Sequence, residues 1–334
     1  VMAPISAFIG RDDERRRLID LVQSRPLVTV VGTGGIGKTR LVSEVSADLA
    51  AAFPGGLQRC ELAPVAPRSE IAAEVAAQLG FPSIDAFVLS RSGETCLVVL
   101  DNCEHVLGAI ASLCTRLLEA TPALHLLATS REPLGIDGEH VLVLGPLAVP
   151  GAGTLQSTEP APSVRLFEDR ARAAGASWGA SDAQSAAVAE LCRRLDGVPL
   201  AIELAAARTR SLTPTEVLQH LDRRFAILTR ATPVGRARHR SLRAAIDASY
   251  DLLDPIERSF FRALGVFAGP FEAGLAHEVA APAGWESVET LDVLTRLVDR
   301  SLIVADQQAV TRYRLLDSLR HYAAEQAVAE DEWD

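Results

Sequence analysis

The chain has 334 residues, of which 48% are apolar and 23% are charged, and its formal net charge is −10. At roughly 100–200 residues per domain this length predicts two or three domains, and the composition excludes a wholly disordered chain. No apolar run approaches the roughly 18 residues that a membrane-spanning helix needs, and the N-terminus lacks the basic-then-apolar order of a secretory signal. We therefore expect a cytoplasmic protein with no membrane partner.

The first 150 residues alternate between strand and helix patterns. Short apolar or β-branched runs predict buried strands at 27–31, 57–62, 95–100, 124–129 and 140–144. Amphipathic spacing predicts helices at 12–23, 38–52, 69–79 and 104–120. Because strands that alternate with helices pair in parallel and are covered on both faces, residues 1–150 are predicted to form an α/β domain.

The strand pattern is lost after a stretch rich in proline, glycine and small residues, 145–162, which is typical of a linker. Helical patterns then follow at 164–174, 183–195, 200–210, 215–221, 242–253, 256–267, 271–281 and 288–301. Two short strands, at 302–305 and 311–315, and a closing helix from Asp317 complete the outline of a winged helix. We predict a linker and an all-helical lid domain over 151–239 and a winged-helix domain over 240–334.

A glycine-rich loop stands between the first predicted strand and the helix at 38–52. Its sequence, GTGGIGKT over 32–39, matches GxxxxGK[ST] in the strand-then-helix context that a phosphate-binding P-loop demands. The backbone N–H groups can wrap phosphates at the helix N-terminus, Lys38 can reach the β- and γ-phosphates, and the Thr39 hydroxyl can ligate Mg²⁺. Lys38 is the single lysine among 33 basic residues, which indicates a chemical role.

Two further strands end in charged residues at the same predicted sheet edge. Asp101 ends the apolar run 96–100, where a carboxylate can hold the water shell of Mg²⁺. Arg131 follows the strand at 124–129, where it either senses a γ-phosphate or is a solvated arginine. The P-loop and Asp101 together predict an ATPase.

Seven segments in chain order carry a resemblance to a known family. They read FIGR (8–11), GTGGIGKT (32–39), LDNCEH (100–105), ATSR (128–131), DGVPLA (196–201), SYDLL (249–253) and YRLLD (313–317). As a set they resemble the STAND class of P-loop ATPases with an NB-ARC-type nucleotide module. The resemblance is closest to the ATPase core of actinobacterial AfsR-type and LuxR-type transcriptional regulators.

The resemblance implies a switch that is closed with ADP, opens and self-associates with ATP, and hydrolyses ATP slowly. It also implies sensor and effector domains, because the chain reads as the core of a longer regulator. Backbone around Ile9 would line the adenine and Pro199 would pack on the base, although a Gly-x-Pro segment is also an ordinary helix start. The expected nucleotide-binding set is Ile9, Gly10, Arg11, Gly32, Thr33, Gly34, Gly35, Ile36, Gly37, Lys38, Thr39, Arg40 and Pro199, with Thr39 and Asp101 as magnesium ligands.

The sequence departs from the family pattern at two places. Leu316 stands where a histidine would contact the ADP β-phosphate, so another donor, such as Arg314 or Arg320, is expected to compensate. Asn102 stands where many members carry a second acid after the magnesium-binding aspartate. Glu104 is then a candidate general base, and its alternative is an acid favoured by the helix dipole. The expected catalytic residues are Lys38, Asp101, Glu104 and Arg131.

Charge distribution bears on the rival functions. Residues 240–334 carry 9 arginines against 17 acidic residues, a net charge of −8, so direct nucleic-acid contact by a winged helix is disfavoured. The arginines between 223 and 240 indicate either a solvated linker or a docking surface for phosphates or an acidic partner. A constitutive remodelling ATPase stays open as an alternative, and fast turnover would distinguish it from a switch.

Overall fold

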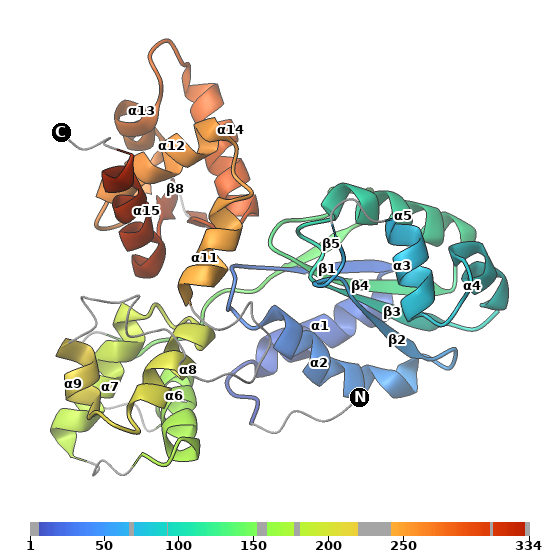
Figure 1. Cartoon of the computed structure of the whole chain (residues 1–334), viewed down its shortest axis with the longest axis horizontal. Coiled ribbons are helices and arrows are strands. Elements are labelled where there is room, and N and C mark those ends of the chain that lie inside the picture. The colour runs from blue at the N-terminus through green and yellow to red at the C-terminus, as the bar shows by residue number, and fades with distance from the viewer. Residues whose placement is uncertain are drawn as a thin grey trace. The chain divides into compact units, whose positions relative to one another are not determined.

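The computed structural model describes residues 7–66, 70–91, 93–151, 159–176, 181–219, 242–307 and 310–330 (Figure 1). The chain divides into two compact units, one made of residues 1–32 and 37–145 and the other of residues 33–36 and 146–334. The division at residue 146 coincides with the start of the predicted linker. Within the described ranges, no helix combines the length and the apolar character that a membrane crossing requires.

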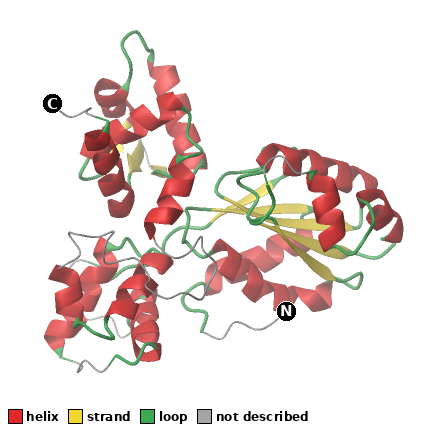
Figure 2. Ribbon diagram, in the orientation of Figure 1, coloured by secondary structure: helices red, strands yellow, loops and turns green. Residues whose placement is uncertain are grey.

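The first unit is built on a five-stranded parallel sheet (Figure 2), whose strands follow the order β2-β3-β4-β1-β5 (Figure 1). Its strands are β1 (Leu27–Val31), β2 (Leu57–Glu61), β3 (Cys96–Asp101), β4 (Leu124–Ser130) and β5 (His140–Val143). β1 and β3 are buried along their whole lengths, which explains why both are almost uninterrupted apolar runs instead of alternating patterns.

Helices cover both faces of this sheet (Figure 1). One face carries α1 (Asp12–Ser24) and α2 (Lys38–Leu49). The other carries α3 (Ile71–Gln78), α4 (Ile84–Ser90) and α5 (Leu107–Ala120). The sequence prediction of a P-loop type of α/β fold is therefore confirmed.

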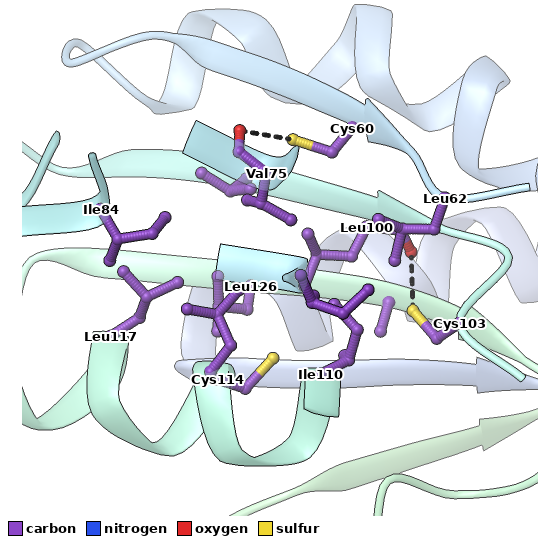
Figure 3. Close-up of a cluster of buried hydrophobic side chains, with 14 of the residues drawn as sticks. Cys60, Leu62, Val75, Ile84, Leu100, Cys103, Ile110, Cys114, Leu117 and Leu126 are labelled. Atoms are coloured by element: carbon purple, nitrogen blue, oxygen red, sulfur yellow. Dashed lines mark hydrogen bonds between the residues drawn. The ribbon is translucent and has the colours of Figure 1, made fainter. Parts of the chain in front are cut away.

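The main apolar core of the unit lies between the sheet and α3, α4 and α5 (Figure 3). Leu100 and Leu126 from the strands meet Val75 and Leu117 from the helices in this core. Cys60 is also part of it, and burial raises the pKa of its thiol to about 12, so the group stays protonated and inert at neutral pH. All five cysteines of the chain are buried and none forms a disulfide.

Strand register sets the position of the candidate site. β1 and β4 pair from Leu27 opposite Leu126 to Val31 opposite Ser130, and β3 pairs with β4 from Cys96 to Leu100. The carboxyl ends of β3, β4 and β1 therefore meet at one edge of the sheet. The P-loop follows β1 at that edge, and Asp101 is the last residue of β3.

The described residues from 159 to 219 in the second unit form four helices, as the sequence predicts. They are α6 (Pro162–Ala173), α7 (Asp182–Arg194), α8 (Pro199–Arg208) and α9 (Pro214–Gln219). α6 packs against α7 and α8, and α7 packs against α9. The arginine-rich stretch 223–240 lies outside the described residues, so both of its interpretations stay predictions.

The rest of the second unit combines helices with a small antiparallel sheet of order β6-β8-β7. Its elements are α11 (Leu242–Tyr250), α12 (Pro255–Ala263), β6 (Phe271–Glu272), α13 (Ala273–Ala280), α14 (Ser287–Asp299), β7 (Val304–Gln307), β8 (Thr311–Arg314) and α15 (Asp317–Ala329). The predicted helix at 271–281 is wrong in its first two residues. Phe271 pairs with Tyr313 of β8 and its ring stacks on Phe267 and Tyr313, so tertiary contacts override the local helical pattern.

Candidate functional site

The P-loop joins the end of β1 to the start of α2. Gly37 is the N-cap of α2 and has a φ of 102°, a left-handed value that favours glycine. A Cβ atom there would meet nothing within 4 Å, so conformation and not space requires the glycine.

Gly35 needs to be glycine for a different reason. Its φ is 81°, and an added Cβ would lie 2.8 Å from Cβ of Leu200. The Leu200 N–H donates to the Gly35 carbonyl at 3.1 Å. Both residues belong to the second unit, where the glycine permits this close backbone contact.

Lys38 begins α2 and is half-buried. Its Nζ donates to the Gly32 carbonyl at 2.5 Å. Burial lowers the pKa of Lys38 to about 8, against the opposing effect of the Glu104 carboxylate, while Arg131 lowers it further. Because burial disfavours its charged form, the Lys38 ammonium is suited to bind an anion. A bound anion would raise the pKa of Lys38 again.

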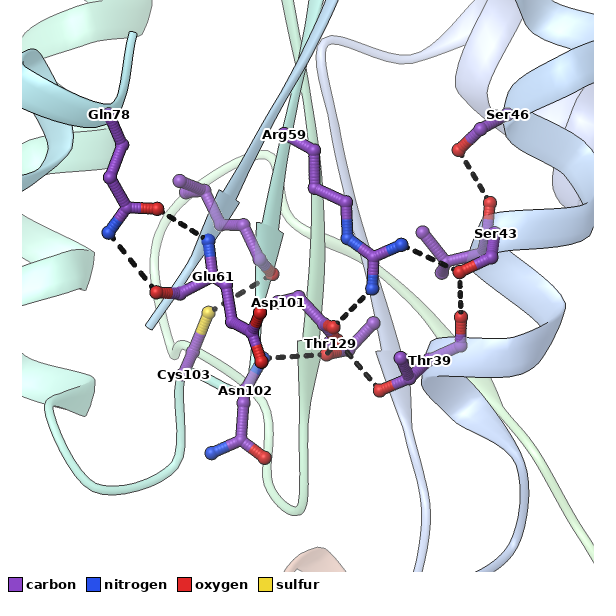
Figure 4. Close-up of polar contacts among 12 residues, drawn as sticks. Thr39, Ser43, Ser46, Arg59, Glu61, Gln78, Asp101, Asn102, Cys103 and Thr129 are labelled. Atoms are coloured by element: carbon purple, nitrogen blue, oxygen red, sulfur yellow. Dashed lines mark hydrogen bonds and ion pairs between the residues drawn. The ribbon is translucent and has the colours of Figure 1, made fainter. Parts of the chain in front are cut away.

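Asp101 is the centre of a compact polar network (Figure 4). Its Oδ1 accepts hydrogen bonds from Thr39 Oγ1 at 2.8 Å and from Thr129 Oγ1 at 2.6 Å. Its Oδ2 accepts one from Arg59 Nη2 at 2.5 Å. The Asp101 side chain is only 3% exposed, so these donors replace the water that an ionised carboxylate would otherwise need.

Thr129 orients the carboxylate through a relay. Its hydroxyl donates to Asp101 and accepts from the Asn102 N–H at 2.8 Å, and its carbonyl accepts from the Cys103 N–H at 2.9 Å (Figure 4). Asn102 has a φ of 73°, a value that asparagine tolerates better than most residues. The turn after β3 is therefore fixed by β4, and it points the carboxylate toward Thr39.

Arg59 was not found from the sequence. It lies on β2, in register with Val99 and two residues before Glu61, which is in register with Asp101. Its Nη1 donates to Ser43 Oγ at 2.6 Å. The available signal was an arginine in the middle of a strand beside the Asp101 strand, but only the register makes the two side chains neighbours.

Glu104 and Arg131 form an ion pair, with Arg131 Nε donating to Glu104 Oε1 at 3.1 Å. The Glu104 side chain is 9% exposed, and its Oε2 has no hydrogen-bond partner within the described part of the chain. Glu104 lies three residues before α5, whose N-cap is Val106, so it does not cap that helix. Arg131 is half-buried and paired, not a solvated arginine.

The other predicted nucleotide contacts are placed as follows. Ile9 is half-buried, Gly10 has a φ of 69°, and Arg11 is buried. Arg11 pairs with Glu14 at 2.7 Å and donates to the Gly145 carbonyl at 2.7 Å, so its side chain is held by the first unit itself. Arg40 is half-buried on the first turn of α2.

In the second unit, Pro199 is the first residue of α8. Two residues earlier, Gly197 has a φ of 67°, and a Cβ there would lie 2.0 Å from the Leu147 carbonyl oxygen. The Gly-x-Pro segment is therefore fixed by a backbone contact to residue 147, whose N–H donates to the Gly197 carbonyl at 3.0 Å.

Leu316 is 2% exposed and occupies the N-cap position of α15, where it offers no capping oxygen. The carboxylate of Asp196, from the turn before α8, accepts a long hydrogen bond of 3.4 Å from the Ser318 N–H on the first turn of α15. Burial raises the pKa of Asp196 to about 7, with a further rise from nearby Asp317. Sequence reasoning missed Asp196 because this contact joins residues 122 positions apart.

The AAA ATPase domain family matches residues 7–133. A protein of Mycobacterium tuberculosis named as an HTH-type transcriptional regulator, Rv0890c, is 42% identical over 312 residues, which make up 91% of this chain and 34% of that protein. An uncharacterized protein of the same species, Rv0894, is 36% identical over 338 residues, or 99% of this chain and 84% of that protein.

The chain belongs to the STAND-like P-loop ATPases. It spans about a third of the length of the regulator relatives that it matches. The Walker-type ATPase PABY2304 of Pyrococcus abyssi shares its fold, with a TM-score of 0.57 over 95% of each chain at 14% identity. The prediction of a STAND-like P-loop ATPase core is therefore confirmed, and the NB-ARC type of its nucleotide module stays a prediction.

Proposed function

We propose that this STAND-like ATPase is the nucleotide-operated switch of a longer transcriptional regulator. It binds ATP or ADP with Mg²⁺, hydrolyses ATP slowly, is closed with ADP, and opens and self-associates with ATP. The observation that carries the proposal is the 2.8 Å hydrogen bond between Thr39 and Asp101, next to a complete P-loop that holds the single lysine. The 42% identity to a protein named as a transcriptional regulator supports the regulatory role.

The P-loop residues fit a polyphosphate. Gly35 and Gly37 hold left-handed φ values, which let successive N–H groups turn toward one anion. The N-terminus of α2 adds a favourable dipole. Lys38 would leave the Gly32 carbonyl and take the β- and γ-phosphates as its partners, and backbone around Ile9 would line the base. The contact of Pro199 with the base stays a prediction.

The donor set of Thr39 and Asp101 fits Mg²⁺, because a hydroxyl and a carboxylate are the hard oxygen ligands that this ion prefers. When bound, the ion neutralises charge on the phosphate oxygens. Thr39 would hold the ion through its hydroxyl oxygen, and Asp101 would hold its water shell. Thr129 keeps the carboxylate aimed during this exchange, because its own partner is the backbone of residue 102.

Hydrolysis is expected to be slow because the candidate base is engaged. Glu104 shares an ion pair with Arg131, so it becomes available to polarise water only when Arg131 turns to the γ-phosphate. Glu104→Gln should slow the single-turnover rate at least tenfold while ATP binding is kept. Glu119→Gln, an exposed acid on α5, is the matched control, and equal rates in the two variants would remove Glu104 from the mechanism.

The closed form would be held in the second unit without a histidine at position 316. Asp196 contacts the first turn of α15 and ties the helical lid to the predicted winged-helix domain. Of the expected compensating donors, Arg320 is paired with Asp317 at 3.4 Å and Arg314 acts on Asp196, whose pKa it lowers, while the arginines between 223 and 240 lie outside the described residues. The ATP form would loosen this contact and expose surfaces for self-association and for the regulator's effector and sensor domains.

The most direct test is to identify the nucleotide that the purified protein carries. Purified protein is denatured and the released nucleotide is identified by chromatography, and ADP in near-stoichiometric amount supports the closed switch. Lys38→Ala should lower ATP affinity at least a hundredfold in calorimetric titration, because it removes the cation that meets the phosphates. Arg17→Ala, an exposed residue of α1, should bind like wild type, and fast steady-state turnover would favour a remodelling ATPase instead.

A further inference from the structure

We propose that Arg59 is a built-in counter-cation that competes with Mg²⁺ for Asp101 when nucleotide binds. This inference rests on the proposed function, because it assumes that the Thr39–Asp101 pair is the magnesium site. Its starting point is the ion pair of 2.5 Å between Arg59 and Asp101 Oδ2.

The carboxylate of Asp101 has donors on both of its oxygens. Two hydroxyl groups donate to Oδ1 and the guanidinium donates to Oδ2. Among these three donors, only Arg59 carries a positive charge. A carboxylate that is 3% exposed needs such a charge, because burying an unpaired anion is costly. Arg59 therefore supplies in the protein what a divalent cation would supply from solution.

Arg59 also has a second hydrogen-bond acceptor besides Asp101. Its Nη1 donates to Ser43 Oγ at 2.6 Å, and its side chain is 25% exposed. Ser43 in turn donates to the Thr39 carbonyl at 2.7 Å, which fixes its hydroxyl in place on α2 (Figure 4). When a cation reaches Asp101, Arg59 can release Oδ2, keep Ser43 and extend its free end into water.

Arg59 should weaken the binding of Mg²⁺ to Asp101. A guanidinium within hydrogen-bonding distance of the metal-binding carboxylate repels an incoming cation, so Mg²⁺ binds only when the repulsion is overcome or Arg59 moves. The competing interpretation is that Arg59 merely orients Asp101. That interpretation predicts the opposite result, since loss of an orienting partner would weaken Mg²⁺ binding.

The experiment follows binding of a fluorescent ADP derivative, first in EDTA and then across a Mg²⁺ titration, with melting temperature as a check on folding. Arg59→Gln should lower the Mg²⁺ concentration for half-saturation at least tenfold, which corresponds to about 1.4 kcal/mol. Arg59→Lys keeps the charge and should stay within about threefold of wild type. Ser43→Ala removes the second hydrogen-bond acceptor of Arg59. The guanidinium should then stay on Asp101, and the Mg²⁺ concentration for half-saturation should rise.

Arg15→Gln is the matched control, because it removes one half of an exposed arginine–aspartate pair on α1 and α2. It should leave the Mg²⁺ response unchanged. An Arg59→Gln titration equal to wild type, or shifted to higher Mg²⁺, would overturn the inference while leaving nucleotide binding in place. Failure of the wild-type protein to bind ADP under any condition would instead overturn the proposed function.

Discussion

Asp101 in the first unit and Asp196 in the second face the same problem, a carboxylate in surroundings that exclude most water. Asp101 meets two hydroxyl groups and the guanidinium of Arg59 at distances of 2.5–2.8 Å. Asp196 meets a backbone N–H at 3.4 Å and has the carboxylate of Asp317 nearby. Burial therefore raises the pKa of Asp196 to about 7, whereas Asp101 is charge-paired.

The difference separates two ways of holding an acid. A carboxylate with a cationic partner can exchange that partner for a metal ion. A carboxylate that lacks a strong partner gains a proton near neutral pH, so its contact with α15 depends on solution conditions. The first arrangement suits chemistry at a phosphate, and the second suits an adjustable contact between helices.

The largest expected effect comes from removing the charge at Asp101. Asp101→Asn should lower Mg²⁺-dependent ATP turnover at least a thousandfold, or about 4 kcal/mol, because the water shell of the ion loses its anion. ADP binding in EDTA should change less than about threefold, since backbone N–H groups and Lys38 hold the phosphates. Turnover assays and calorimetry on one preparation measure both quantities. Equal losses of ADP and ATP affinity with unchanged turnover would make Asp101 a structural acid.

A smaller effect, on stability, is expected at Asp196. Its pKa is raised from 3.8 to about 7, so the folded state binds more protons than the unfolded state between these values. Stability from this group is therefore present at low pH and is lost as pH rises toward 7. Asp196→Asn mimics the protonated form and should stabilise the protein by about 2 kcal/mol at pH 8, after allowance for partial exposure.

Melting temperatures of the wild type and of Asp196→Asn at pH 5 and pH 8 test this point. The variant should melt higher than the wild type at pH 8, and the difference between them should be clearly smaller at pH 5, where only part of the stability has been lost. Asp182→Asn, an exposed acid on α7, serves as the control for a change of net charge. A difference that is the same at both pH values would show that Asp196 is ionised throughout.

The smallest effect is expected at Leu316. This residue is buried, and Asp196 already accepts the hydrogen bond of the Ser318 N–H on the first turn of α15. Leu316→His should change ADP release by less than about threefold, well under one tenfold step of about 1.4 kcal/mol. Stopped-flow fluorescence of a labelled ADP measures the rate. A hundredfold slowing would mean that the closed form lacks a compensating donor and that position 316 sets its lifetime.

The sequence was sufficient for the parts of the site that lie on one continuous segment. The loop at 32–39 follows β1 and opens α2, and Asp101 ends β3, as the patterns predict. The closeness of Thr39 and Asp101 follows from the rule that parallel strands bring their carboxyl ends to one edge. Local signals of this kind do not depend on which strands are neighbours.

Residues whose role depends on strand order or on tertiary contact were not predictable. Arg59 is next to Asp101 because β2 pairs with β3 in a particular register, and Thr129 reaches it because β4 lies on the other side of β3. Helix α4 was also missed, since its seven residues are too few for a clear helical period. It depends on Ser83, whose hydroxyl accepts the Ala86 N–H at 3.2 Å.

One feature of the P-loop makes the molecule unusually simple to probe. Lys38 carries the only side-chain amine among the 334 residues, and burial lowers its pKa to about 8. A fraction of it is therefore an uncharged nucleophile at mildly alkaline pH. Apart from the α-amino group, an amine-selective acylating reagent or a lysine-modifying enzyme can act on these 334 residues only at the phosphate loop. A single mass tag then reports, without any engineered label, how much of the protein has its loop filled.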